Sequence, residues 1–373
     1  MTGTGIATVA RQEFRLRIRA GRWRLLLAIW FAVLLLFTVL LRSAIGGFNG
    51  NGNDISDKGV IIYGGLMLFV LGLALLVVPA LAAQSVNGDR ERGTLATLQV
   101  TRLTAADIAL GKFAAAWGTS LVFLALTLPL VAYAITQKGV PISRTLVVTL
   151  VLALLLGTVC AVSLALSAVL SRTTTSGVLA YLAVFALTVG TLITFGLVTA
   201  TTSESYTETY TNECPSLPPE IPEQQRTEIL ANCGKPQTVQ SSRVRTDRTW
   251  WLLAPNPFVV LADAAPRLPP ETAAQRRARQ EREARGQYQQ SARDLDPLGS
   301  IGNAVRDLRR PPQATNRGSF SYSPLTPKER NRTRLVWPYG LAFDVLLGVA
   351  ALTLTTRRLR TPSRVLPRGQ RVA

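Results

Sequence analysis

Six uninterrupted apolar runs dominate this sequence, and each is about as long as a helix must be to cross the hydrocarbon layer of a bilayer. The runs cover residues 25–41, 60–83, 113–135, 146–170, 177–200 and 336–356. Charged residues make up 17% of the chain and gather between the runs, and the mean hydropathy is +0.24. This distribution does not suit two compact soluble domains. It predicts an all-α membrane protein with six transmembrane helices, because a helix satisfies its own backbone groups in lipid.

The segment before the first run is strongly basic. Its basic residues are Arg11, Arg15, Arg17, Arg19, Arg22 and Arg24. A cleaved signal peptide is one interpretation, but the run is longer than a usual signal core and five more runs follow it. Phe14 and Ile18 lie one helical turn apart among the arginines, which is typical of a helix at the level of the lipid headgroups. We therefore predict that residues 1–24 form a cytoplasmic basic arm with an N-terminal amphipathic elbow helix.

The short loops fix the predicted orientation, because Lys and Arg are enriched in cytoplasmic loops. With the N-terminus inside, the arm, residues 84–112, Arg172 and the tail 357–373 carry 17 basic residues. The short loops on the other side carry four, namely Arg42, Lys58, Lys138 and Arg144. We expect both termini in the cytoplasm of a bacterial-type plasma membrane.

Residues 201–335 form a long polar insert between the fifth and sixth runs, and this topology places the insert outside the cytoplasm. Its first half reads as irregular and contains Cys214 and Cys233, which an oxidising exterior would allow to pair. Residues 250–261 begin with two tryptophans and are expected at the outer membrane interface. Residues 271–293 alternate Arg, Glu, Gln and Ala, which predicts a solvated helix rather than a binding arm.

Several kinds of chemistry are excluded by composition. The chain contains no His and three cysteines, so imidazole bases and Cys-rich zinc sites are ruled out, and no metal site is predicted. The net charge of +19 borders the apolar runs and forms no compact basic domain, which disfavours nucleic-acid binding. Asp344 is the one acid well inside a run. It is either a functional intramembrane polar site or a carboxyl that is hydrogen-bonded to a neighbouring helix or close to the wet outer end.

The predicted cytoplasmic loop 84–112 is the most informative segment. Thr94 is a suitable N-cap, and Leu95 and Leu98 fall on one side of a short helix that would follow it. Gly93 permits the turn before that helix. The apolar side of such a helix can dock against a partner, or it can pack against the membrane surface as part of an ordinary loop. The pattern alone leaves both open.

This loop resembles that of ABC-2 type transporter permeases, which carry Glu, Gly-Thr, several leucines, Thr-Pro and, about ten residues later, Gly-Lys. The matching residues are Glu91, Gly93, Thr94, Leu95, Leu98, Thr101, Leu103, Gly111 and Lys112. Arg102 stands where the family has proline. The basic elbow, the spacing of the six runs and an Asn-Pro-Phe segment before the last run also resemble this family.

The resemblance implies that this loop is a coupling helix that seats in a separate ABC ATPase subunit. The coupling residues would be Glu91, Arg92, Gly93, Thr94, Leu95, Leu98 and Thr101. ATP and Mg²⁺ would be bound by that partner, because Gly111-Lys112 is followed by Phe113 and no phosphate-binding GxxxxGK[ST] motif occurs. The chain itself would be no enzyme and bind no cofactor.

The same resemblance implies a second permease copy or a paralogue as partner, and export as the direction of transport. Another class of function remains open. The chain could be a membrane-anchored extracytoplasmic binding or assembly protein whose working part is the insert 201–335.

Overall fold

The structure is a computed structural model that describes most of the chain. The described residues are 3–19, 22–47, 57–93, 103–211, 222, 236–269, 272–285, 295–309, 313–314, 320–321 and 335–360. The description below refers to these residues.

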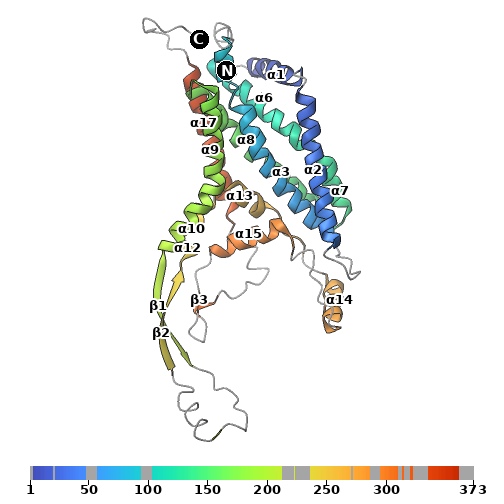
Figure 1. Ribbon diagram of the computed structural model, residues 1–373, viewed down its shortest axis with the longest axis vertical. Coiled ribbons are helices and arrows are strands. Elements are labelled where there is room, and N and C mark those ends of the chain that lie inside the picture. Colours follow the sequence, from blue (N-terminus) through green and yellow to red (C-terminus); the bar gives the residue numbers. More distant parts are fainter. Residues whose placement is uncertain are drawn as a thin grey trace.

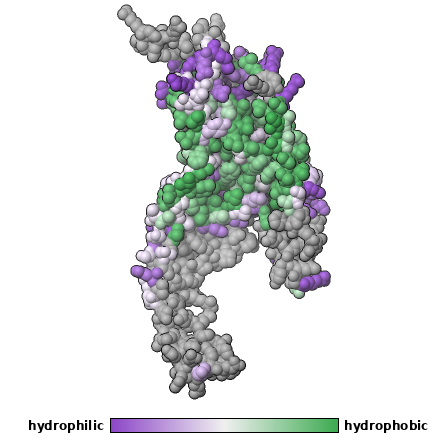
Figure 2. Space-filling view, viewed as in Figure 1, coloured by the Kyte–Doolittle hydropathy of each residue, from purple (hydrophilic) through white to green (hydrophobic). Residues whose placement is uncertain are grey.

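Six helical segments are long and apolar enough to cross a membrane, as predicted. They are α2 (Arg22–Gly47), α3 (Lys58–Ala82), α6 (Ala105–Ala125) with α7 (Leu128–Thr136), α8 (Ile142–Val169), α9 (Thr173–Phe185) with α10 (Thr191–Thr201), and α17 (Trp337–Leu359). They run side by side in one bundle (Figure 1), and their apolar side chains form a belt across the face seen in Figure 2. This is the architecture of a multi-pass membrane protein.

The third span differs from the predicted run at both its start and its middle. Helix α6 begins at Ala105, because Thr104 and Asp107 form a capping box in which each side chain accepts from the backbone N–H of the other. The span then breaks at Leu126 and Thr127, and α7 starts afresh with Pro129 in its first turn. Proline fits that position because its missing N–H has no helical partner there.

Helix α8 lies at the centre of the bundle, where it packs against α3, α6, α9 and α17. Its inner face buries small and aliphatic residues, which allows close approach of the neighbouring helices. In contrast, the fifth span lies at the edge of the bundle. It consists of α9, α10 and the π-helix η1 (Ala186–Gly190) that joins them, and most of its apolar side chains are exposed. Such side chains are suited to lipid or to another membrane protein.

Two short elements lie at the end of the bundle that carries the start of the chain and the last turn of α17, hereafter the terminal end (Figure 1). Helix α1 (Gly3–Arg19) crosses this end and packs on α6. A Cβ atom on Gly111 would lie 2.6 Å from Cβ of Val9, so glycine is what allows this close approach. Helix α4 (Asn87–Glu91) follows α3 after one turn.

The insert occupies the opposite end of the bundle, hereafter the insert end, and it is not purely helical. Strands β1 (Ser203–Thr211) and β2 (Pro236–Val244) form an antiparallel hairpin, with Ser203 opposite Val244. Strands β3 (Gln313–Ala314) and β4 (Phe320–Ser321) form a second, very short sheet. The prediction of an irregular first half was therefore wrong for β1 and β2, whose Thr and Tyr residues favour strands.

The remaining elements of the insert are short helices. They are α12 (Thr246–Thr249), the 3₁₀-helix η2 (Trp250–Leu252), α13 (Pro257–Ala264), α14 (Ala273–Ala284) and α15 (Pro297–Leu308). Residues 250–261 do not lie together at a surface as predicted: Trp251 is exposed, but α13 is buried against α8, α15 and α17. Helix α14 lies within the predicted solvated helix. Helix α15 was not predicted.

Two buried ion pairs, one between the insert and α8 and one between two helices of the insert, fix the position of the insert. Arg144 of α8 donates from Nη2 to both carboxylate oxygens of Asp296, at 2.7 and 2.8 Å. Asp263 of α13 accepts from Arg306 of α15 and, at 2.7 Å, from the backbone N–H of Val336 at the start of α17. Removing one partner of such a pair leaves a buried charge uncompensated, so the two pairs hold α13 and α15 in fixed positions.

Candidate functional site

A buried lysine at the terminal end joins three segments that are far apart in sequence. The side chain of Lys112 is fully inaccessible, and its Nζ donates to the carboxylates of Glu13 in α1 and Asp89 in α4. Nζ also donates to the backbone oxygen of Ser85, at 3.0 Å. All three donors of the ammonium group are therefore used. We call these four residues the Lys112 cluster.

The Gly111-Lys112 pair explains why α1 lies where it does. Gly111 lets Val9 and the backbone of Ile6 approach α6 closely, and the next residue supplies the charge that Glu13 meets. A larger residue at 111 would push α1 away and separate Glu13 from Lys112. The two residues of the motif therefore act together, one by its small size and the other by its charge.

The segment between α3 and α4 is also fixed to the junction of α8 and α9. The backbone N–H groups of Val86 and Asn87 both donate to Oγ of Ser167, at 3.2 and 3.1 Å. Ser176 donates from Oγ to the backbone oxygen of Ala83, at 2.7 Å. These hydrogen bonds are buried, so this part of the loop is attached to two spans besides its own.

The charged residues of α4 extend this attachment. Arg90 donates from Nη1 to the backbone oxygen of Leu170, at 3.2 Å. Glu91 accepts from the backbone N–H of Thr173, at 3.3 Å, near the start of α9. Arg92 is different: its side chain is 70% exposed and pairs with Asp89 at 3.1 Å. Of these three side chains, Arg92 is the most available to a partner.

The predicted coupling residues are only partly described. Glu91 and Arg92 lie at the terminal end, and Gly93 has a φ of 72°, which glycine adopts without strain. The predicted helix after Thr94 lies outside the described residues, as do Leu95, Leu98 and Thr101. The short helix that the structure does describe in this loop, α4, lies just before the predicted one.

Together with Arg92, the Lys112 cluster is electrically balanced. Lys112 and Arg92 face the two carboxylates of Glu13 and Asp89, whose side chains are 18% and 13% exposed. Nearby, burial lowers the pKa of Arg17, which donates from Nη1 to Oγ1 of Thr119 at 3.4 Å. This arrangement contains no thiol and no imidazole. It can hold α1, α4 and α6 together and carry a displacement from one to the others.

The remaining predicted site residues lie elsewhere. Asp344 is buried on the face of α17 that packs on α8, and its backbone oxygen accepts from Oγ1 of Thr158 at 3.1 Å. Its carboxylate has no hydrogen-bond partner among the described residues, so the predicted bond to a neighbouring helix is not made by that group. Cys214 and Cys233 lie outside the described residues.

No protein-family model matches this chain, and no curated protein does. The resemblance of the loop to ABC-2 type permeases therefore rests on the residues themselves.

Sequence reasoning missed three members of the Lys112 cluster, Glu13, Ser85 and Asp89. A signal for Glu13 is present, because it is the only acid in residues 1–24 and stands among six arginines. An acid in such a basic helix can form an ion pair with a neighbouring arginine. The sequence therefore does not indicate that Glu13 pairs with Lys112, which is 99 residues away. In the described part of the chain, no group of His, Cys, Asp and Glu residues is arranged to hold a metal ion.

Proposed function

We propose that this chain is the membrane subunit of an ATP-driven exporter of the ABC-2 type, and that it couples to a separate ATPase subunit through the loop between α3 and α6. Two copies, or one copy and a paralogue, would form the substrate pathway. The terminal end would face the cytoplasm of a bacterial cell, where the ATPase binds ATP and Mg²⁺.

The observation that carries this proposal is the Lys112 cluster. A loop that receives force from a partner must be attached rigidly to the spans that move. Here the loop is attached to α1 and α6 through Lys112 and to α8 and α9 through Ser167 and Ser176. A push on Arg92 and the residues after it would therefore displace several spans together, as in a rigid-body switch.

A second observation supports moving spans rather than a static anchor. The fifth span contains η1, and π-helices occur frequently at functional sites. Asn256 donates from Nδ2 to the backbone oxygen of Thr188, at 2.8 Å, and to Oγ1 of Thr191, at 2.9 Å. An apolar groove of about 570 Å³ lies beside it, lined by residues of α3, α9, η1 and α13, including Phe69 and Phe258.

The alternative, a binding protein whose working part is the insert, has less support. The described helices α13 and α15 are buried against the spans and joined to them by Arg144 and Asp296. These two helices of the insert thus continue the bundle, whereas β1, β2 and α14 extend beyond it (Figure 1).

The proposal is tested by deleting residues 92–98 from the full-length chain and purifying it from native membranes in mild detergent. We expect the variant to insert normally but to lose an ATP-hydrolysing subunit that co-purifies with the intact chain. A deletion of equal length in α14, residues 276–282, is the matched control and should retain the subunit. Equal ATP hydrolysis in all three preparations would contradict the role of the loop.

A further inference from the structure

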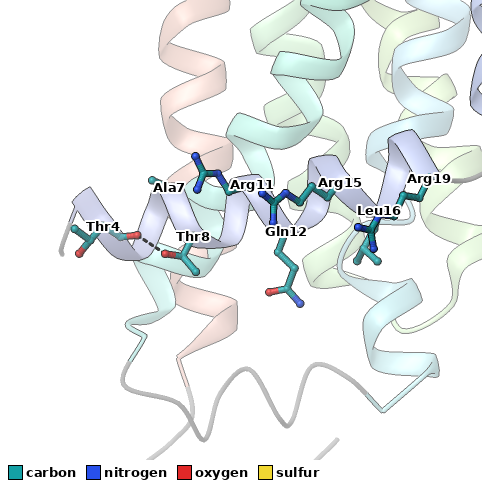
Figure 3. Close-up of a pocket in the computed structure, with 8 residues that line it drawn as sticks. All are labelled: Thr4, Ala7, Thr8, Arg11, Gln12, Arg15, Leu16 and Arg19. Atoms are coloured by element: carbon teal, nitrogen blue, oxygen red, sulfur yellow. Dashed lines mark hydrogen bonds between the residues drawn. The ribbon is translucent and has the colours of Figure 1, made fainter.

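Helix α1 carries a groove of about 610 Å³ on the side that faces away from α6 (Figure 3). Three of its lining residues are Arg11, Arg15 and Arg19, which we call the arginine stripe. They are four residues apart and so lie along one side of the helix. Thr8 and Gln12 add polar groups beside them.

The arginine stripe has no counter-charge on the described protein. Like charges four residues apart on a helix repel one another. The single acid of α1, Glu13, lies on the other side of the helix and is paired with Lys112. None of the three arginines forms an ion pair with a residue that the structure describes. An anion from outside the chain would therefore stabilise this face.

The surroundings of the stripe indicate a lipid rather than an acidic protein. Leu16 is 63% exposed and Ile18 is 46% exposed, and the two lie on either side of the stripe. Helix α1 crosses the terminal end (Figure 1), where the apolar belt gives way to hydrophilic residues (Figure 2). Apolar residues beside arginines at such a level are typical of a helix among lipid headgroups, where arginine stems lie along apolar surface.

We infer that the arginine stripe binds the phosphate groups of anionic phospholipids in the leaflet at the terminal end. Guanidinium groups suit this ligand because they donate two parallel N–H bonds to phosphate oxygens. Each basic residue near an anionic surface strengthens binding roughly fivefold, so three contribute on the order of a hundredfold. The site lies on the helix that supplies Glu13 to the Lys112 cluster, but the inference does not depend on the proposed function.

The test measures lipid binding to the full-length protein in neutral detergent by native mass spectrometry. Phosphatidylglycerol and phosphatidylcholine of the same acyl chains are compared, with inorganic phosphate as a competitor. Three variants are used: the stripe changed to Gln (R11Q, R15Q and R19Q), the stripe changed to Lys, and a control in which three exposed arginines in α14 and directly after it are changed to Gln (R276Q, R277Q and R285Q).

The expected result is a preference of at least about tenfold for phosphatidylglycerol in the intact protein, a conservative bound on the electrostatic gain. The Lys variant and the α14 control should keep this preference, and the Gln variant should lose it. Three results would overturn the inference: equal binding of the two lipids, an unchanged preference in the Gln variant, or displacement of the lipid by millimolar phosphate. A fold check by size exclusion separates loss of the site from misfolding.

Discussion

Replacing Lys112 by methionine should destabilise the protein far more than removal of an ordinary surface charge. The Lys112 side chain is fully inaccessible, and the carboxylates of Glu13 and Asp89 are 18% and 13% exposed. The substitution keeps the length of the side chain but leaves the largely buried carboxylate of Glu13 without its cation, and leaves Asp89 paired with the exposed Arg92. Breaking a buried pair in this way costs about 3–5 kcal/mol. The loss is measured as the change in unfolding free energy on SDS titration in mixed micelles.

A compensated variant separates charge from packing. Adding Glu13→Gln and Asp89→Asn to Lys112→Met removes the buried charges together, so most of the lost stability should return. A loss below about 1 kcal/mol for Lys112→Met alone, the range of an exposed ion pair, would refute the view that this cluster is buried and essential to the terminal end.

Three further predictions concern other parts of the molecule. Gly111→Ala should destabilise the protein by about 1–3 kcal/mol in the same titration, because the Cβ of the new alanine would overlap α1. The control is Gly118→Ala on the same helix, where the added Cβ meets open space, and it should be neutral or slightly stabilising. Hydrogen bonds from the guanidinium of Arg245 hold the pKa of Asp247 below its ordinary value of 3.8. The stability that ionised Asp247 contributes is therefore present above pH 3.8 and is lost as the pH falls through the folded pKa. Hydrogen exchange in β2, corrected for intrinsic rates, should accordingly be faster in Asp247→Asn than in the unchanged protein at pH 7, and the difference should shrink as the pH falls through the folded pKa. Cys214 and Cys233 lie in one polar segment that is predicted to face an oxidising exterior, so protein from that exterior should resist alkylation at both until it is reduced; alkylation without reduction would contradict this.

The spans could be predicted from sequence because their signal is local. A run such as 146–170 needs only its own length and composition to identify it, and α8 (Ile142–Val169) matches it closely. The break in the third span has a local signal too, since Pro129 is visible in the sequence. That signal does not fix the outcome, because an interior proline can bend a membrane helix or end it, and packing decides between the two.

The Lys112 cluster and α15 could not be predicted, because their signals depend on contacts between distant residues. Lys112 reads as the head of a span, and only the fold brings Glu13 to it. Helix α15 begins at Pro297 in a Gly- and Pro-rich stretch, and its position depends on the pairing of Asp296 with Arg144, 152 residues away. The hairpin was missed for a different reason: both strands are polar on both faces, so no alternation marks them.

The central claim is that this chain transmits energy from a separate ATPase. The most direct test is to purify the full-length chain from native membranes in mild detergent and to measure ATP hydrolysis by the product. We predict an ATP-hydrolysing subunit in fixed stoichiometry with the chain, and loss of that subunit when residues 92–98 are deleted. A pure, correctly inserted chain with no associated ATP hydrolysis would contradict the account.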